Sequence, residues 1–322
     1  MFDLDDLERA TEIVRRHVAP TPQYEWPLLS EMAGSTVVVK HENHTPVGAF
    51  KVRGGLVYRD RLVSERPNVS GVVSATRGNH GQSLAFAGRV HERSVTIFVP
   101  HGNSVEKNAA MRALGADVVE FGDDFQEARE RSIEFASEGG LEPVPPFHRD
   151  LVLGVATYAK ELFDAAGELD TVYVPVGMGS GINALIAVRD LLGLDTQIVG
   201  VVSELAPSTL LSFERGEVVT TESAATFVDG VATRSPDPVS IAGIVAGAAR
   251  VVAVSDDATA EAMRIIYRTT HNVAESAGAI GLAGLLSEPR EQRGGRSAFV
   301  LCGGNVDSSQ FHAVLGGATP RP

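Results

Sequence analysis

Lys51 is the residue of this sequence best placed to attack a bound carbonyl compound. It stands in the segment Gly48-Ala49-Phe50-Lys51-Val52-Arg53-Gly54, where small residues leave room around its side chain. A lysine becomes a useful nucleophile only when burial or nearby cations lower its pKa. Because this lysine follows a short apolar run and a turn, it can reach into a cleft and react there. The alternative is an exposed lysine at the start of a helix.

Two glycine-containing segments offer groups that could bind a polar ligand. In residues 176–184 the glycines let backbone N–H groups crowd around an anion, and a following helix adds a favourable dipole. This segment lacks both the Lys-Ser/Thr ending of a nucleoside-triphosphate loop and the dinucleotide spacing. In residues 74–83, Gly78 permits an unusual backbone angle from which the Asn79 amide can point at a ligand. Tight packing, or a simple turn before a helix, would also explain either segment.

Short apolar runs alternating with helix-like segments indicate how these residues are held. Apolar residues recur at helical spacing over residues 4–18, which predicts an amphipathic opening helix. Strands interleaved with helices predict parallel sheets covered on both faces. Residues 139–147 are rich in Gly and Pro and are the best linker candidate. The predicted strands cover residues 37–39, 71–74, 95–99, 117–120, 172–176, 198–202 and 298–301.

Composition narrows the class of protein. The 322 residues carry a formal charge of −13, so binding to a nucleic-acid backbone is not expected. No uninterrupted apolar run approaches the length of a membrane span, and the acidic opening segment does not resemble a signal peptide. The single Cys302 excludes an internal disulfide and fits a reducing compartment, so a cytoplasmic location is expected. By itself Cys302 is explained by a place in the core.

Taken together, four motifs resemble the fold-type II pyridoxal-phosphate enzymes, and most closely the serine/threonine dehydratases. The lysine motif of that family is Lys-x-Glu followed by Gly-Ser-Phe-Lys-x-Arg-Gly, and this chain departs from it at Ala49. The other three motifs are the loop at 76–80, the glycine loop at 177–181 and the segment Cys302-Gly303-Gly304-Asn305. The resemblance extends over residues 20–310. The positions that fit the lysine motif are Lys40, Glu42, Gly48, Phe50, Lys51, Arg53 and Gly54.

The resemblance implies an α/β fold like that of the tryptophan synthase β chain, with two open, twisted, mostly parallel sheets flanked by helices. A small domain (residues 71–147) would be inserted into a large one (1–70 and 148–322), with pyridoxal 5′-phosphate between them. Relatives are commonly dimers or tetramers, so a homo-oligomer is expected.

The resemblance also assigns roles to individual residues. Lys51 is the implied catalytic residue and would carry the cofactor as a Schiff base. A neutral Cys302 thiol would lie beside the ring nitrogen, where it favours rapid loss of a β-leaving group over transamination. The implied cofactor-binding residues are Phe50, Lys51, Asn79, Gly177, Met178, Gly179, Ser180, Gly181, Gly230, Glu275 and Cys302. The implied substrate-binding residues are Thr76, Arg77, Gly78 and His80.

The expected activity is dehydration and deamination of a small hydroxy amino acid, such as threonine or serine, to a 2-oxo acid and ammonia. Arg77 replaces the small residue that is usual in dehydratases, and serine racemases have Ser there. Because arginine is a poor acid–base catalyst, we expect little racemisation. Arg77 could instead bind the second carboxylate of a substrate such as 3-hydroxyaspartate, or simply face solvent. Cysteine-synthase-like β-replacement, racemisation and a catalytically silent ligand-binding protein remain alternatives. A metal stays unassigned, because Glu204 lacks the expected Asp partner.

Overall fold

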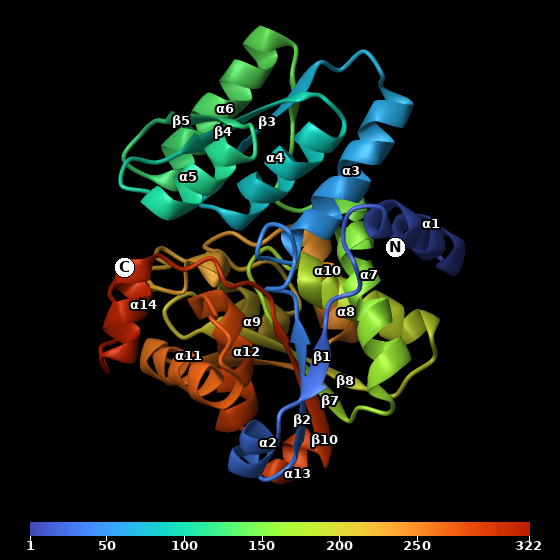
Figure 1. Cartoon of the computed structure of the whole chain (residues 1–322), viewed down its shortest axis with the longest axis vertical. Coiled ribbons are helices and arrows are strands. Elements are labelled where there is room, and N and C mark those ends of the chain that lie inside the picture. Colours follow the sequence, from blue (N-terminus) through green and yellow to red (C-terminus); the bar gives the residue numbers. More distant parts are fainter.

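The computed structural model describes residues 1–322 and contains two separate β-sheets (Figure 1). The larger sheet has the order β1-β2-β10-β7-β8-β9, and all neighbours in it are parallel except the edge pair β1 and β2. The smaller sheet has the order β5-β4-β3-β6 and is parallel throughout. The prediction of an α/β fold with two mostly parallel sheets is confirmed.

Six strands form the larger sheet, which lies in the lower lobe of Figure 1. Their bounds are β1 Gln23–Glu25, β2 Thr36–His41, β7 Thr171–Pro175, β8 Gln197–Ser203, β9 Arg250–Val254 and β10 Arg296–Leu301. The smaller sheet, in the upper lobe, consists of β3 Gly71–Ala75, β4 Ser94–Val99, β5 Asp117–Glu120 and β6 Glu142–Pro143.

Helices cover both sheets. The central helix α12 packs on the larger sheet, and α6 packs on the smaller one opposite α4. The helices are α1 Leu4–Arg15, α2 Pro27–Ala33, α3 Lys51–Glu65, α4 Asn79–Val90, α5 Val105–Ala113, α6 Phe125–Gly139, α7 Arg149–Ala166, α8 Ser180–Leu191, α9 Ser208–Arg215, α10 Pro238–Gly247, α11 Asp256–Thr270, α12 Ser276–Ser287, α13 Arg290–Arg293 and α14 Ser308–Leu315, with a short 3₁₀ turn, η1, at Asp229–Val231. No helix is both long and apolar enough to cross a membrane.

The hydrophobic cores follow the two sheets. A cluster of 64 buried residues surrounds the larger sheet, and clusters of 12 and 5 residues lie against the smaller one. Tyr58 and Leu62, in the second half of α3, belong to the 12-residue cluster together with Val72 of β3. We therefore propose that the small domain comprises residues 71–147 and also takes its packing from the second half of α3.

The predicted linker at 139–147 contains structure. Helix α6 ends there at a left-handed Gly140, and residues 142–143 pair with Val72 and Val73 of β3 as the edge strand β6. Calling the whole segment a linker was therefore wrong: proline is tolerated at a sheet edge because its missing N–H is not needed on the open side. The opening helix also ends earlier than predicted, at Arg15.

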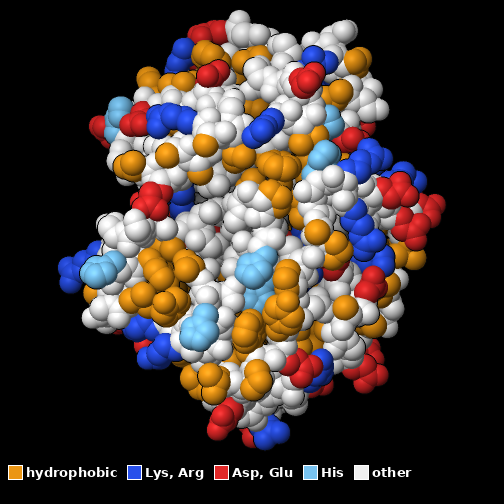
Figure 2. Space-filling view, in the orientation of Figure 1, with side chains coloured by type: hydrophobic (Ala, Val, Ile, Leu, Met, Phe, Trp, Pro, Cys, Tyr) orange, Lys and Arg blue, Asp and Glu red, His pale blue; other side chains and the backbone are white.

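Both sheets direct the carboxyl ends of their strands toward the region between the lobes. Ligands of open α/β sheets bind outside the carboxyl ends of parallel strands. The segments that follow β2, β3, β7 and β10 are the ones that carry the four sequence motifs. Figure 2 shows an indentation on the left side of the molecular outline between the two lobes.

Candidate active site

Lys51 begins α3 directly after a tight loop that leaves β2. The loop is held against the end of β10, because the Phe50 N–H donates to the Cys302 carbonyl at 3.0 Å. Gly48 has a φ of +68°, and a Cβ added there would lie 2.6 Å from the Asn305 amide oxygen. A glycine is therefore needed at position 48 for this close approach. Together these contacts place the motif lysine beside the Cys302 segment.

The side chain of Lys51 reaches the glycine loop. Its Nζ donates to Ser180 Oγ at 3.2 Å and lies 5.0 Å from the centre of the Phe50 ring. Burial lowers the pKa of the Lys51 amine to about 8, against a small raising effect from Cys302. Burial likewise raises the pKa of the Cys302 thiol well above its ordinary value, so the thiol is neutral at pH 7. The site therefore combines a lysine that is readily deprotonated with a neutral thiol.

The loop between β7 and α8 presents unpaired backbone donors. The N–H groups of Gly177, Met178 and Gly179 donate to no acceptor, and the first N–H groups of α8 have no partner within the helix. Gly179 adopts a φ of +90°, and a Cβ at Gly177 would lie 2.4 Å from the Gly230 carbonyl oxygen. The loop thus packs against residue 230, and its donors are suited to an anion such as a phosphate.

Asn79 is fixed in orientation by two neighbours. Its Nδ2 donates to Glu275 Oε1 at 2.6 Å, and its Oδ1 accepts from Asn305 Nδ2 at 2.8 Å. Asn305 Nδ2 also donates to the Val47 carbonyl at 2.8 Å. Burial raises the pKa of Glu275 to about 7, so this carboxyl group can hold a proton near neutral pH.

Three predicted substrate-binding residues, Thr76, Arg77 and Gly78, lie in the loop that precedes Asn79, and the fourth, His80, lies in the first turn of α4. Thr76 Oγ1 accepts from the Gly78 N–H at 3.1 Å. His80 is buried and its Nε2 has no partner, while burial and the charge of Lys51 lower the pKa of His80 to about 3. The imidazole is therefore neutral. Arg77 is exposed, and its guanidinium forms neither an ion pair nor a hydrogen bond.

Most of the predicted residues are thus brought together. Lys51, Phe50, Ser180 and Cys302 form one group, and Asn79 with Glu275 forms a second. Gly230 lies against the glycine loop, and its own Cα approaches Ala277 of α12 so closely that a Cβ would lie 2.6 Å from the Ala277 Cβ. The side chain of Arg77 forms no hydrogen bond or ion pair with any of the other predicted residues. Glu204 is exposed, and nowhere in the structure do three His, Cys, Asp or Glu side chains group as metal ligands would.

Sequence reasoning overlooked several residues of this region. Ser83 Oγ donates to the Lys51 carbonyl at 2.6 Å, and Tyr158 donates to the Gly181 carbonyl at 3.3 Å. Lys107, at the start of α5, forms an ion pair with Asp229 at 2.6 Å. Tyr158 and Lys107 stand outside the motifs. Ser83 and Asn305 carried a signal, because Ser83 ends the segment at 74–83 and Asn305 ends the glycine segment after Cys302.

Comparisons with known proteins agree with this geometry. The family model described as "Pyridoxal-phosphate dependent enzyme" matches residues 14–303. The chain is 30% identical to an L-threonine ammonia-lyase of Thermotoga maritima, covering 98% of this chain and 78% of that protein. It is 32% identical to an L-threo-3-hydroxyaspartate ammonia-lyase of a Pseudomonas species, covering 97% of this chain and 98% of the other.

A solved structure is also similar over almost the whole chain. The processed form of threonine deaminase isoform 2 from Solanum lycopersicum superposes with a TM-score of 0.90 and 28% identity, covering 98% of this chain and 89% of the other. The matched residues 14–303 include the lysine motif, the two loops at 76–80 and 177–181, and the first two residues of the segment that begins at Cys302. The chain therefore belongs to the pyridoxal-phosphate dependent enzymes, which confirms both the family and the cofactor that its motifs predicted.

Proposed function

We propose that this enzyme is an ammonia-lyase that converts threonine or serine to a 2-oxo acid and ammonia. The substrate would lose its α-proton and its β-hydroxyl as water, and hydrolysis of the product would then release ammonia. The observation that carries the proposal is the partly buried Lys51 amine, 3.2 Å from Ser180 and next to a loop with unpaired N–H groups. The names of the relatives support this reaction class.

The chain's own groups fit the cofactor. The donors of residues 177–182 suit its phosphate, and the Lys51 amine suits its aldehyde. The Cys302 thiol would face the ring nitrogen, and the Asn79 amide, oriented by Glu275 and Asn305, would face the ring oxygen. Pyridoxal phosphate, when bound, withdraws electrons from the α-carbon of an attached amino acid.

Lys51 would also move the α-proton. Once its amine is free, a pKa of about 8 leaves an appreciable fraction neutral near pH 7, so it can accept a proton from the α-carbon. Ser180 Oγ, which accepts a hydrogen bond from this amine, would hold it at that position. The neutral Cys302 cannot keep the ring nitrogen protonated as a carboxylate would. That difference favours prompt loss of the hydroxyl over racemisation or transamination.

The lowered pKa of Lys51 predicts how the protein freed of cofactor reacts with an amine reagent. Acetylation of position 51, followed by peptide mass spectrometry, is expected to accelerate with rising pH and to reach half its maximal rate near pH 8. Between that value and the ordinary 10.5 the folded state binds fewer protons than the unfolded state, so this group makes stability rise with pH. A midpoint near 10.5 would contradict the burial of this amine, and Lys51→Arg provides the unreactive control.

A substrate screen tests the proposed activity. The holoenzyme is incubated with the L and D forms of threonine, serine and 3-hydroxyaspartate, and 2-oxo acid and ammonia are measured together. Equal amounts of both products from threonine or serine are expected. Formation of a thioether only when a thiol is added would instead indicate β-replacement, and conversion of L to D without ammonia would indicate a racemase.

3-Hydroxyaspartate is the second candidate substrate, because Arg77 follows Thr76 in the substrate loop and has no partner. A charge-assisted hydrogen bond to a second carboxylate contributes about 1.5–3 kcal/mol. Arg77→Ala is therefore expected to lower kcat/KM for 3-hydroxyaspartate by about 10- to 100-fold and to change that for threonine by less than about threefold. Equal losses of kcat/KM on both substrates, or no loss on either, would contradict the proposal that Arg77 binds the second carboxylate of 3-hydroxyaspartate.

We further propose a homo-oligomer located in the cytoplasm. Hydrophobic and histidine side chains gather on the face of the lower lobe shown in Figure 2, and Tyr24, Leu28 and Met32 are among the exposed apolar residues. Such patches are typical of association surfaces. Light scattering behind a sizing column tests the oligomer, and a monomer at micromolar concentration would contradict it.

A further inference from the structure

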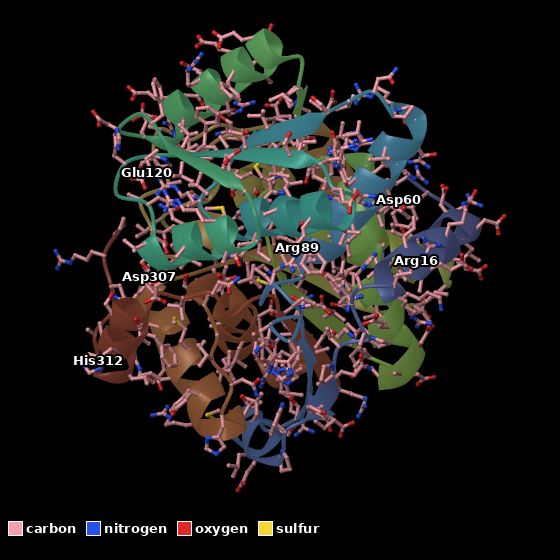
Figure 3. The ribbon with its side chains drawn as sticks, turned by 45° about the horizontal axis from the view of Figure 1, so that its top comes forward. Arg16, Asp60, Arg89, Glu120, Asp307 and His312 are labelled. Carbon is pink, nitrogen blue, oxygen red and sulfur yellow. The ribbon has the colours of Figure 1, made fainter.

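The first turn of α5 connects the upper lobe to the lower lobe at three points. Ser104, the N-cap of α5, donates from its hydroxyl to Asp307, and Glu106 accepts from the Ser308 N–H at 2.9 Å. Lys107 Nζ lies 2.6 Å from Asp229 Oδ2. Figure 3 shows Asp307 between the small lobe and α14, on the side where this turn lies. Because one helical turn makes all three contacts, they form and break together.

Lys107 differs from the other two residues because it is buried at the substrate loop. Its residue exposure is 8%, and a Cβ added at Gly78 would lie 2.6 Å from Lys107 Cδ. The apolar stem of the lysine therefore packs directly against the backbone of the loop that binds substrate in the proposed function. An alanine at position 78 would need the stem to move, so the two residues are sterically matched.

The ammonium group of Lys107 joins both lobes electrostatically. Besides Asp229, it lies 3.9 Å from Glu275 Oε2, and Glu275 accepts from Asn79 through its other oxygen. Burial lowers the pKa of Lys107, but Asp229 and Glu275 raise it by more, so the group stays charged. The ammonium group of Lys107 thus lies near η1 and the residue before α12, while its apolar stem contacts the loop before α4. Arg112 lies near the other end of α5 and forms only an exposed ion pair, with Glu120 at 3.2 Å.

We propose that Lys107 is a positioning residue: paired with Asp229 across the lobes, it keeps the first turn of α5 closed over the site and holds the loop at 76–80 in place. The inference rests on the proposed function only for the identity of the substrate. A loop that is misplaced by about 1 Å can cost about 100-fold in rate, so a residue that touches no substrate can still control binding.

Hydrogen exchange tests the closure without any substrate. Holoenzyme carrying Lys107→Met is compared with Arg112→Met, which breaks the exposed pair on the same helix. Amides of residues 103–108 and 76–80 are expected to exchange about tenfold faster in Lys107→Met and at the wild-type rate in Arg112→Met. Unchanged exchange in Lys107→Met would overturn the proposal, whether or not the wild type acts on threonine.

Kinetics then separate positioning from a general loss of structure. Lys107→Met and Asp229→Asn are each expected to raise KM about tenfold with a smaller change in kcat, and the double variant is expected to be no worse than either single one. Lys107→Arg, which keeps the charge, is expected to stay within about threefold of the wild-type KM. Additive losses in the double variant, or a fall in kcat at constant KM, would overturn the proposal. If Lys107→Met does not fold, the same measurements of hydrogen exchange, KM and kcat on Asp229→Asn and Lys107→Arg test the proposal instead.

Discussion

Lys51→Ala is expected to lower turnover by at least about 10⁴-fold, because it removes both the amine that holds the cofactor and the base that takes the α-proton. The substitution is not expected to lower the stability of the folded protein. The Lys51 amine makes a single hydrogen bond, to Ser180, and burial disfavours its charged form. Removing it therefore removes a desolvation penalty, and the thermal midpoint of the cofactor-free protein is expected to stay the same or rise.

The measurement combines single-turnover kinetics with the absorbance of the bound cofactor. The covalently bound form should be absent from Lys51→Ala while the cofactor still binds reversibly through residues 177–182. Lys160→Ala, which breaks an exposed pair with Asp164, is the matched control and should behave as the wild type. Full turnover by Lys51→Ala would contradict the proposed mechanism. A loss of folded structure in this variant would show that the lysine has a structural role instead.

The sequence predicted most of the strands because buried parallel strands are continuous apolar runs. The observed β4 begins one residue before its predicted start, and β8 extends one residue beyond each of its predicted ends. Two strands of the larger sheet were missed. Strand β1 lacks the apolar signal, because it is a three-residue edge strand with two exposed side chains. Strand β9 does contain an apolar run after Arg250, at residues 251–254, and sequence reasoning overlooked it.

The site was predictable where its residues stand in motifs and not where they meet across the fold. Lys51, Asn79 and Cys302 could be found because each lies in a string of several matching residues. Lys107 and Asp229 are 122 residues apart, and nothing in the sequence around Lys107 points to this pairing. The pairing follows from the way the lobes dock, which local sequence does not encode. For the same reason the sequence alone left two alternatives for Arg77, a contact with a carboxylate or exposure to solvent.

The motif positions Lys40, Glu42 and Arg53 show the same limit. The sequence identifies them as part of the lysine motif, but the structure shows that they form one buried charge network with Glu161 of α7. Arg53 Nε donates to Glu42 Oε2 at 2.8 Å, and Arg53 Nη1 and Nη2 donate to the two Glu161 oxygens, each at 2.9 Å. Lys40 Nζ completes the network at 2.7 Å from Glu161. The side chains of Arg53 and Glu42 are 0% exposed.

This network makes Arg53 the residue whose loss should cost the most stability. Arg53→Met keeps an unbranched side chain but leaves Glu42 and Glu161 in the interior with only Lys40 as a countercharge. Breaking a buried charge pair by removing one partner costs about 3–5 kcal/mol. We therefore expect the free energy of unfolding in urea to fall by about that amount. Because Arg53 lies two residues after Lys51 on α3, the remaining activity should fall as well.

Arg61→Met is the matched control on the same helix. Arg61 also pairs with two carboxylates, those of Asp6 and Asp150, but its side chain is 24% exposed. Exposed pairs contribute about 0–1 kcal/mol, so this variant should lose little. If the two variants lose equal stability, burial is not what makes the network important.

The difference in unfolding free energy between the wild type and Arg53→Met can be measured as a function of pH. Its pH dependence distinguishes a loss of electrostatic stabilisation from a loss of packing. In the wild type Arg53 and Lys40 hold the pKa of Glu161 below its ordinary 4.5 against the effect of burial, so that group's contribution is present above pH 4.5 and is lost as the pH falls. In Arg53→Met burial acts on the Glu161 carboxyl without Arg53 to oppose it, so the pKa of Glu161 should be raised and the folded state should then bind more protons than the unfolded state. The variant's deficit should therefore shrink between pH 8 and pH 5, whereas a deficit caused by lost packing would stay constant over the same range.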